Sequence, residues 1–415
     1  MNFKFSRQHA AILVLCSVAA AAKADDAPNP TLVSQVAKQV EQDLGISVWG
    51  YMRGGFYGAA KGEPHGQYQL GGDLQHYRLG NEGNTYIEIG IGKKFDLGNG
   101  VKWGAYYMPT VNDGHLGTAQ LYADVTGLGI APGATFWGGQ RYHRVQDIHM
   151  IDNFLVQDGD NYGAGVDGIA LGGGATLNLA VHSSDSFANN ASNPNNAKRV
   201  NFQLRDLPVN PGGKLSIDGG VVHGNFAIGS GGGTLGLLHN QSDFLVKGVT
   251  NSLFAQVSTG HADLNGEFYA LDSNGVAQSG ARRWRLVDSL NWQVGAFGGQ
   301  SVLGYEVTKP TQGSEVKDTS IGGRISYGVA QYIKLLGEAA YTSRAIAGQD
   351  TQHLNKEVIA VALSPNTDYW TRPEFRIYAQ HSNWNDAAAA ANSSTFGLNG
   401  RTNAMSYGVQ MEAWW

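Results

Sequence analysis

The last nine residues restrict the possible folds of this chain more than any other segment. Tyr407, Val409, Met411, Ala413 and Trp415 alternate with Gly408, Gln410, Glu412 and Trp414. A period of two places these sets on opposite faces of a β-strand. One apolar face, one mainly polar face and a terminal aromatic are typical of a strand between lipid and a wet lumen. A half-buried terminal strand of a soluble sandwich would show a similar alternation.

The opposite end of the chain has the features of an export signal. Lys4 and Arg7 precede an apolar run at residues 10–22, and Ala22-Lys23-Ala24 follows as an A-x-A cleavage site. This order predicts a Sec signal peptide that comprises residues 1–24 and is removed. Cys16, the only cysteine, lies within it. The mature chain is therefore predicted to contain no disulfide, although its compartment would permit one.

The rest of the sequence favours membrane strands over membrane helices. After residue 24 no run approaches the about 18 apolar residues that a membrane helix requires. Short alternating segments, such as residues 85–91 and 374–380, are separated by turns rich in Gly, Asn and Asp. Strands in hydrocarbon must form a closed barrel, which leaves no unpaired backbone edge. Tight turns and longer polar loops, at residues 185–198 and 386–401, are typical of an outer-membrane barrel.

Charge and the N-terminal extension complete the outline. The formal net charge of −5 gives no indication of a nucleic-acid partner. Leu32, Val36, Val40 and Leu44 recur every four residues within residues 25–45, which predicts a short amphipathic helix. Two interpretations of this periplasmic extension remain open: a frayed end, or a helix that self-associates in an oligomer.

Aromatic residues share the polar parity of several predicted strands. In the first predicted strand, Trp49, Tyr51 and Arg53 share one face, and Val48, Met52 and Phe56 share the other. Two further sets combine aromatic and charged residues on one face: Tyr86 with Glu88, and Trp370 with Arg372, Glu374 and Arg376. Aromatic rings facing water are costly unless an apolar group covers them. The C–H faces of pyranose rings provide such a group, while sugar hydroxyls bind charged side chains. The pattern predicts a saccharide track, although filler inside the barrel or an interfacial girdle would also use aromatics.

Six motifs in order carry a specific resemblance. They are YRLGNE at 77–82, WGGQRY at 137–142, DIHMID at 147–152, NPGG at 210–213, Thr-Arg-Pro at 371–373 and QMEAWW at 410–415. In these motifs the chain resembles the maltoporin family of outer-membrane sugar porins. The resemblance implies an all-β, transmembrane antiparallel barrel of about 18 strands over residues 46–415, in contact with outer-membrane lipid. It also implies a homotrimer, and facilitated diffusion of maltose, maltodextrins or related oligosaccharides without a cofactor.

The resemblance assigns roles to individual residues. An aromatic slide would comprise Tyr51, Tyr86, Trp370 and Trp414. Polar-track residues would be Arg53, Arg78, Glu88, Asp147 and Asp152. An inward-folded third loop, at about residues 145–160, would narrow the channel with His149 and Phe154. A metal or hydrolytic role for Asp147, His149 and Asp152 is not supported, since no further ligand or nucleophile has suitable spacing.

Departures from the family pattern indicate an altered sugar preference. The second-loop segment, at residues 109–119, contains no tryptophan, whereas the family typically has one in this loop. At the position of the family's third-loop arginine this chain has Val145. Arg144 is one place away, where alternation turns a side chain to the other face. Phe154 lacks the hydroxyl of its family counterpart. Two alternatives remain: a general-diffusion porin, and an outer-membrane hydrolase or adhesin, for which no nucleophile–base pair is evident.

Overall fold

The computed structural model describes residues 45–59, 67–157, 159, 161–184, 197–224, 226, 230–271, 280–392, 396 and 400–415. The predicted signal peptide and all but the last residue of the predicted 25–45 extension lie outside these ranges. No helix among the described residues is long and apolar enough to cross a bilayer.

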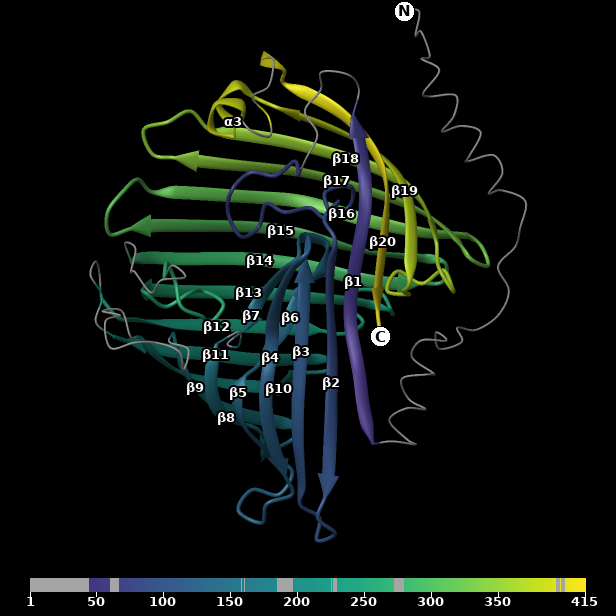
Figure 1. The fold of residues 1–415 in the computed structure, drawn as a ribbon. Coiled ribbons are helices and arrows are strands. Elements are labelled where there is room, and N and C mark those ends of the chain that lie inside the picture. Colours follow the sequence, from purple (N-terminus) through teal and green to yellow (C-terminus); the bar gives the residue numbers. More distant parts are fainter. Residues whose placement is uncertain are drawn as a thin grey trace, which may run out of the picture.

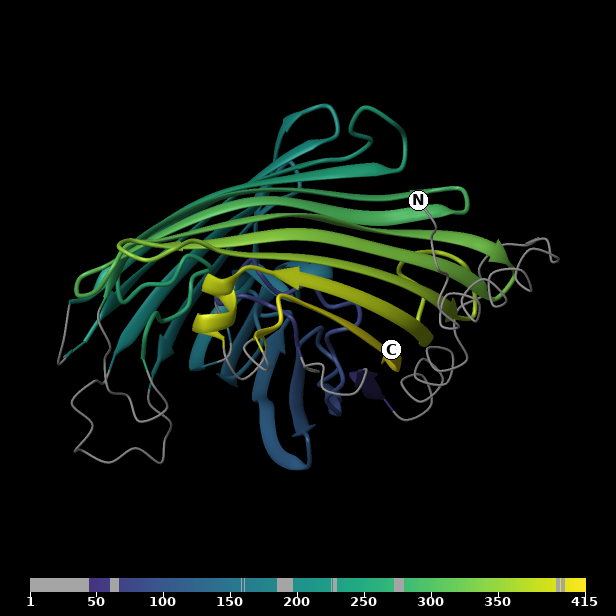
Figure 2. The same ribbon diagram turned by 90° about the horizontal axis from the view of Figure 1, so that it is seen from above.

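Eighteen antiparallel strands form one closed wall. They are β1 (Ile46–Ala59), β2 (Tyr86–Asp96), β3 (Lys102–Asn112), β4 (His115–Thr126), β5 (Thr135–Gln140), β8 (Tyr162–Gly172), β9 (Ala175–Ser183), β10 (Lys198–Asn210), β11 (Gly213–His223), β12 (Gly232–Gln241), β13 (Val249–Gly260), β14 (Ala281–Val294), β15 (Phe297–Pro310), β16 (Val316–Ala330), β17 (Ile333–Ile346), β18 (Gln352–Leu363), β19 (Glu374–Trp384) and β20 (Asn403–Trp414). Each strand pairs with the next in this order, and β20 pairs with β1. Figure 1 shows these first and last strands side by side, and Figure 2 shows the wall from above. The predicted all-β barrel is confirmed.

Alternation along the strands separates two faces of the wall. On β14, Trp284 and Leu286 are exposed, whereas Arg283 and Arg285 are buried inside the barrel. The closing strand β20 follows the same rule, with Tyr407 exposed and Glu412 fully buried. Apolar side chains therefore face the lipid and charged side chains face the interior, as membrane barrels require.

The interior is partly filled by segments that connect the wall strands. One is residues 67–85, between β1 and β2, whose Leu74 and Tyr77 are buried. Another contains β6 (Arg144–Ile148), the 3₁₀ turn η2 (His149–Ile151) and β7 (Asn153–Gln157). Both contribute to one apolar cluster with Phe254, Val287 and Val302 of the wall. This cluster thus lies mainly against β12–β15, a second one packs Leu79 on β17–β19, and the inner surface around β20, β1 and β2 lines a cavity.

The predicted loop at 386–401 contains a helix, α3 (Asp386–Ala391). Alanine is the strongest helix former, and the Asn385 side chain caps the helix by accepting a hydrogen bond from the Ala388 backbone N–H at 3.1 Å. Ala388 is buried in a cluster with Tyr68, Trp384 and Phe396. The helix is therefore anchored by Ala388, whereas Ala390 and Ala391 are exposed.

The segment at 109–119 is not an open loop, which corrects the expectation from the sequence. Strands β3 and β4 continue through it and are joined only by Asp113 and Gly114. Both residues have positive φ, at 47° and 84°, as in the tight hairpin turns that suit twisted strands. Leu116 pairs with Val111 and is 78% exposed.

Candidate functional site

The segment that contains β6, η2 and β7 is the third loop, and it folds into the barrel. A cavity of about 730 Å³ lies between this loop and the wall strands β1, β2 and β20. Sites for small molecules in proteins usually have volumes of about 300–1,000 Å³, and this cavity falls within that range. The residues that line it are Tyr51, Arg53, Arg78, Tyr86, Arg144, Asp147, His149, Asp152, Asn153, Phe154, Gln157, Trp370 and Trp414.

Four aromatic rings converge on this cavity from four places in the sequence. Tyr51 lies opposite Trp414 in the β1–β20 register, and its ring centroid is 6.1 Å from that of Tyr86. Trp370, from the connection between β18 and β19, has its centroid 6.5 Å from that of Trp414. The His149 ring lies 5.4 Å from Trp370 and 5.3 Å from Trp414. Parity places Tyr51 and Trp414 inside, whereas Trp370 depends on how its connection folds.

Two buried glutamates hold the charged part of the site together. Glu82 accepts hydrogen bonds from Arg53 at 2.8 Å and from Arg78 at 2.7 Å. Glu412, on β20, forms ion pairs with Arg78 at 3.0 Å and with Arg372 at 2.8 Å. Because these acids neutralise Arg78 and Arg372, whose side chains are only 3% and 2% exposed, this part of the network is primarily a scaffold; the Arg53 side chain remains 15% exposed. The scaffold fixes the residue 67–85 segment to the closing strand.

This scaffold also orders the aromatic rings. The Arg78 guanidinium donates a hydrogen bond to the Tyr51 hydroxyl, which donates to Glu412 at 3.0 Å. The Arg372 guanidinium lies 4.2 Å from the centre of the Trp414 ring. Cation–π contacts of this kind hold an aromatic plane in one orientation. The rings are thus pre-organised before any ligand arrives.

Carboxylates of the third loop are more accessible than the neighbouring Arg78 of the residue 67–85 segment. The side chains of Asp147 and Asp152 are 31% and 38% exposed, against 3% for Arg78. Burial raises the pKa of Asp152, but the positive charges of Arg78 and Arg53 outweigh it and bring the pKa below its usual value. Asp152 therefore remains ionised at neutral pH and presents hydrogen-bond acceptors to the cavity.

Arg144 lines the cavity together with Phe154. Its guanidinium lies 3.6 Å from the centre of the Tyr142 ring and 4.9 Å from that of Phe154. Alternation alone suggested that Arg144 would face away. The β6–β7 pairing has register shifts on both sides of Gln146, and such shifts alter the alternation of side chains.

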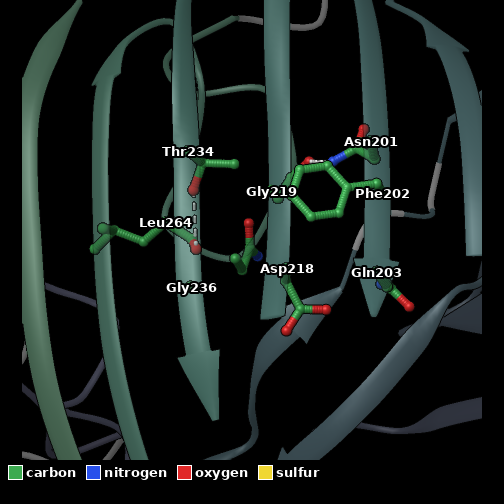
Figure 3. A pocket seen from close by; sticks show the side chains of 10 residues that line it. Asn201, Phe202, Gln203, Asp218, Gly219, Thr234, Gly236 and Leu264 are labelled. Carbon is green, nitrogen blue, oxygen red and sulfur yellow. Dashed lines mark hydrogen bonds between the residues drawn. The ribbon is translucent and has the colours of Figure 1, made fainter. Parts of the chain in front are cut away.

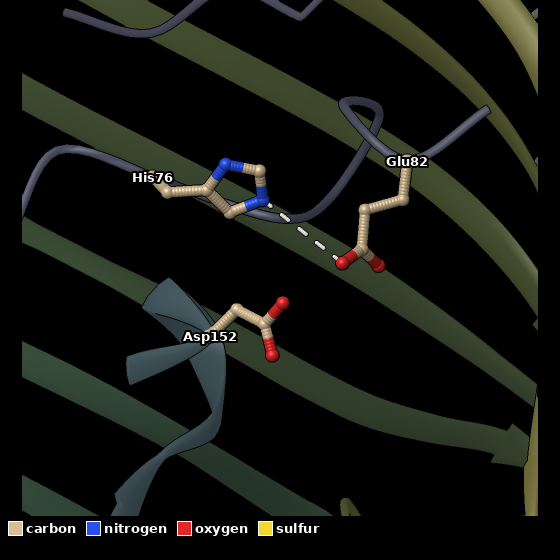
Figure 4. Close-up of side chains that lie close together, drawn as sticks. All are labelled: His76, Glu82 and Asp152. Atoms are coloured by element: carbon tan, nitrogen blue, oxygen red, sulfur yellow. Dashed lines mark ion pairs between the residues drawn. The ribbon is translucent and has the colours of Figure 1, made fainter. Parts of the chain in front are cut away.

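Among the described residues, His76, Glu82 and Asp152 form a group with ligand-type atoms within 4.8 Å of one another (Figure 4). His76 lies 3.9 Å from Glu82, and burial lowers the pKa of the imidazole. Both carboxylates already form ion pairs with Arg53 and Arg78. A cation would have to displace or approach these guanidinium groups, so the geometry favours an arginine–carboxylate network over a metal centre.

A second hollow, of about 10 Å³, lies behind β10–β12 (Figure 3). That volume accommodates about one water molecule and no sugar. Asn201 donates a hydrogen bond to the Gly266 carbonyl at 2.8 Å, and Thr234 donates to the Leu264 carbonyl at 3.4 Å. The hollow therefore belongs to the attachment of the residue 261–271 segment to the wall.

The structure brings nearly all of the predicted site residues to the main cavity. Glu88 is not among the lining residues; its carboxylate accepts hydrogen bonds from the hydroxyls of Tyr86 at 2.9 Å and Tyr142 at 3.3 Å. Glu82 and Glu412, which organise the arginines, were not among the residues predicted to form the site. Glu412 had a usable signal, because it shares the parity of Trp414 on the closing strand.

Known proteins to which the chain is similar include two solved structures and one protein family. OmpT of Vibrio cholerae, in-vitro folded and in a trimer form, is 9% identical, with 89% of this chain and 99% of that chain covered and a TM-score of 0.43. A mutant of the Rh. blastica porin is 13% identical, with coverages of 89% and 100% and a TM-score of 0.43. At these TM-scores neither likeness carries further argument. The model of the LamB porin family matches residues 46–415. The resemblance is thereby confirmed: the chain belongs to the LamB porin family and is an outer-membrane channel, not an enzyme.

Proposed function

We propose that this porin is a channel for facilitated diffusion of maltose, maltodextrins or related oligosaccharides. The observation that carries the proposal is one cavity lined by Tyr51, Tyr86, Trp370 and Trp414 together with arginine and aspartate side chains. Sugar rings stack on the aromatic faces while their hydroxyls exchange hydrogen bonds with Arg53, Asp147 and Asp152. Successive stacking positions let the sugar advance without losing all its contacts at once.

The other predicted site residues and the N-terminal segments have supporting roles in this proposed channel. Arg78 and Glu88 hold the tyrosines in place, and His149 with Phe154 narrows the passage. Residues 1–24 act as the export signal, and 25–45 form a periplasmic extension to the 46–415 barrel.

A homotrimer is the proposed assembly. The resemblance to maltoporins supports it, and so does a polar strip on the outer surface of β18 and β19. Glu357 and His381 lie 3.9 Å apart there, with side chains 69% and 39% exposed, and Asn355 donates a hydrogen bond to Asn383 at 3.0 Å. Polar groups on a lipid-facing surface are costly, which favours cover by a neighbouring subunit. Chemical cross-linking in membranes tests this: dimers as the largest species would contradict it.

Block of the ion current by sugars tests the transport proposal. Single channels in planar bilayers are titrated with maltose-series sugars, sucrose and a β-glucoside. Saturable block that strengthens along the maltose series is the expected result, since longer sugars cover more rings. Current that falls only with solution viscosity, equally for all sugars, would instead identify a general-diffusion porin.

A further inference from the structure

A second group of aromatic rings lies on the inner wall, outside the main cavity. Trp49 precedes Tyr51 by two residues on β1, and Tyr106 and Tyr122 face each other on the paired strands β3 and β4. The Trp49 and Tyr106 centroids are 6.1 Å apart, and the Tyr106 and Tyr122 rings stack at 4.6 Å with an interplanar angle of 18°. We name these three residues the lower aromatic wall. They lie toward the barrel end at which β1 begins and β2 turns into β3. Most of the short turns, such as those at residues 97–101, 173–174 and 211–212, lie at this end, although the β3–β4 turn lies at the other. Short turns are typical of the periplasmic end of outer-membrane barrels.

Glycines beneath these rings determine how they lie. Trp49 pairs with Gly90, and a Cβ added to that glycine would lie 2.1 Å from Cε2 of the indole. A Cβ on Gly92 would lie 2.4 Å from Cδ1 of Tyr106. Glycine inside a strand often marks a place where another group approaches the backbone closely. Trp49 and Tyr106 therefore rest against the backbone of β2, and Tyr122 stacks on Tyr106. Trp49 remains partly exposed, so the indole offers a surface to the lumen.

Charged groups flank this surface. The Arg141 guanidinium lies 5.4 Å from the centre of the Tyr122 ring and forms an ion pair with Asp167 at 2.5 Å. Asp124, two residues after Tyr122 on β4, is partly exposed on the same inner face. A flat aromatic face with nearby charged donors and acceptors is the combination that the main cavity also presents to a sugar.

We propose that the lower aromatic wall is a second saccharide-stacking surface at the periplasmic side of the channel, with Trp49 as its principal platform. This inference rests on the proposed sugar-porin function and extends it. The lower aromatic wall receives the oligosaccharide as it leaves Tyr51, and captures sugar that arrives from the periplasm. Its ligand class is a pyranose oligomer, held by one ring face and by hydrogen bonds to Arg141 and the neighbouring carboxylates.

Side-specific sugar kinetics test this inference. Maltotriose is added to either side of channels inserted in one orientation, and association rates are obtained from current noise. Loss of one stacking contact corresponds to about a two- to tenfold change. Trp49→Ala should lower the association rate from the periplasmic side by that factor, with a smaller change from the outside. Trp49→Phe should retain most of the rate, because a flat ring remains.

Two further variants separate stacking from folding. Trp103, on β3 near the same end, is 50% exposed on the outer face, so Trp103→Ala is the matched control and should leave both association rates unchanged. Gly90→Ala keeps the indole but displaces it from the wall, and should reproduce the periplasmic defect even if Trp49→Ala fails to assemble. Each variant's ion conductance reports whether the barrel has formed.

The outcomes distinguish this inference from the function on which it rests. If Trp370→Ala weakens the block while Trp49→Ala and Gly90→Ala leave the periplasmic rate unchanged, the second surface is overturned and the sugar porin stands. If no maltose-series sugar blocks the wild-type channel from either side, the proposed function fails and this inference fails with it.

Discussion

At the scale of single residues, Trp370 gives the most direct test of the proposed aromatic slide. Its side chain is 36% exposed and lines the cavity, and its indole N–H donates to Asn291 at 3.1 Å. Stacking contributes about 0.5–1.5 kcal/mol beyond area burial in aromatic pairs, and a similar loss corresponds to roughly two- to tenfold in affinity. We expect Trp370→Ala to weaken maltooligosaccharide block by this factor, with ion conductance equal or slightly higher. Unchanged block would remove Trp370 from the slide.

Asp152 sets the expected acid limit of the site. Burial raises its pKa, and the larger opposing effect of Arg78 and Arg53 lowers it overall. A depressed pKa in the folded state stabilises the protein above the unfolded value of about 3.9, and this contribution is lost as pH falls through the folded pKa. Sugar block and channel noise should therefore be constant from pH 7 to about pH 4.5 as far as Asp152 is concerned. Asp152→Asn, which lacks this titration, is the control. A wild-type transition between about pH 5 and 7 that Asp152→Asn retains would point to a histidine instead.

At the scale of elements, the third loop depends on partners distant in the sequence. The Met150 backbone N–H donates to Gln300 of β15 at 2.8 Å, and the Leu155 carbonyl accepts from Gln256 and Arg285. Gln300→Leu would leave a buried N–H unpaired, at a cost of about 1–3 kcal/mol. The loop should loosen, so single-channel recordings should show larger and noisier conductance.

A matched glutamine controls for the loss of a buried amide. Gln352 is 4% exposed on β18 and accepts a hydrogen bond from Asn392, beyond α3, at 3.4 Å. Gln352→Leu should leave the conductance of the channel unchanged. Equal effects of the two substitutions would mean that the Gln300 bond is not what holds the third loop in place.

These elements also explain how far the sequence could predict the structure. Period-two alternation correctly indicated which side of the wall residues such as Phe375 and Arg376 would face, because that property depends only on neighbours in one strand. The two-residue turn at Asp113-Gly114 was missed, since the strands on both sides continue without a change of composition. The position of Arg144 was also missed, because register shifts in a hairpin are not visible in a single sequence. The Gln300 anchor joins residues 150 positions apart, a distance that no local pattern reaches.

At the scale of the whole molecule, the pairing of β20 with β1, here called the closing joint, closes the barrel. Trp415 and Gly50 exchange backbone hydrogen bonds, each at 3.2 Å, which complete the pairing of β20 with β1. A Cβ added to Gly50 would lie 2.7 Å from the Trp415 ring, so the indole lies directly over this glycine. The neighbouring Trp414 instead points inward against His149 and Arg372. Adjacent tryptophans therefore face opposite sides of the same wall.

This opposition predicts that the two tryptophans have separable roles. Trp415→Ala removes the apolar cover over the joint and, because a barrel without closure exposes unpaired backbone to hydrocarbon, should lower the yield of folded protein in membranes. Trp414→Ala should assemble normally and weaken sugar block. Gly50→Val, whose side chain would meet both the Glu88 carbonyl oxygen and the Trp415 ring, should also lower the yield of folded protein. The measurements are the folded fraction on unheated gels and the sugar titration of channels that do insert. Equal assembly of both alanine variants with equal loss of sugar affinity would contradict the assignment of Trp415 to the closing joint and Trp414 to the slide.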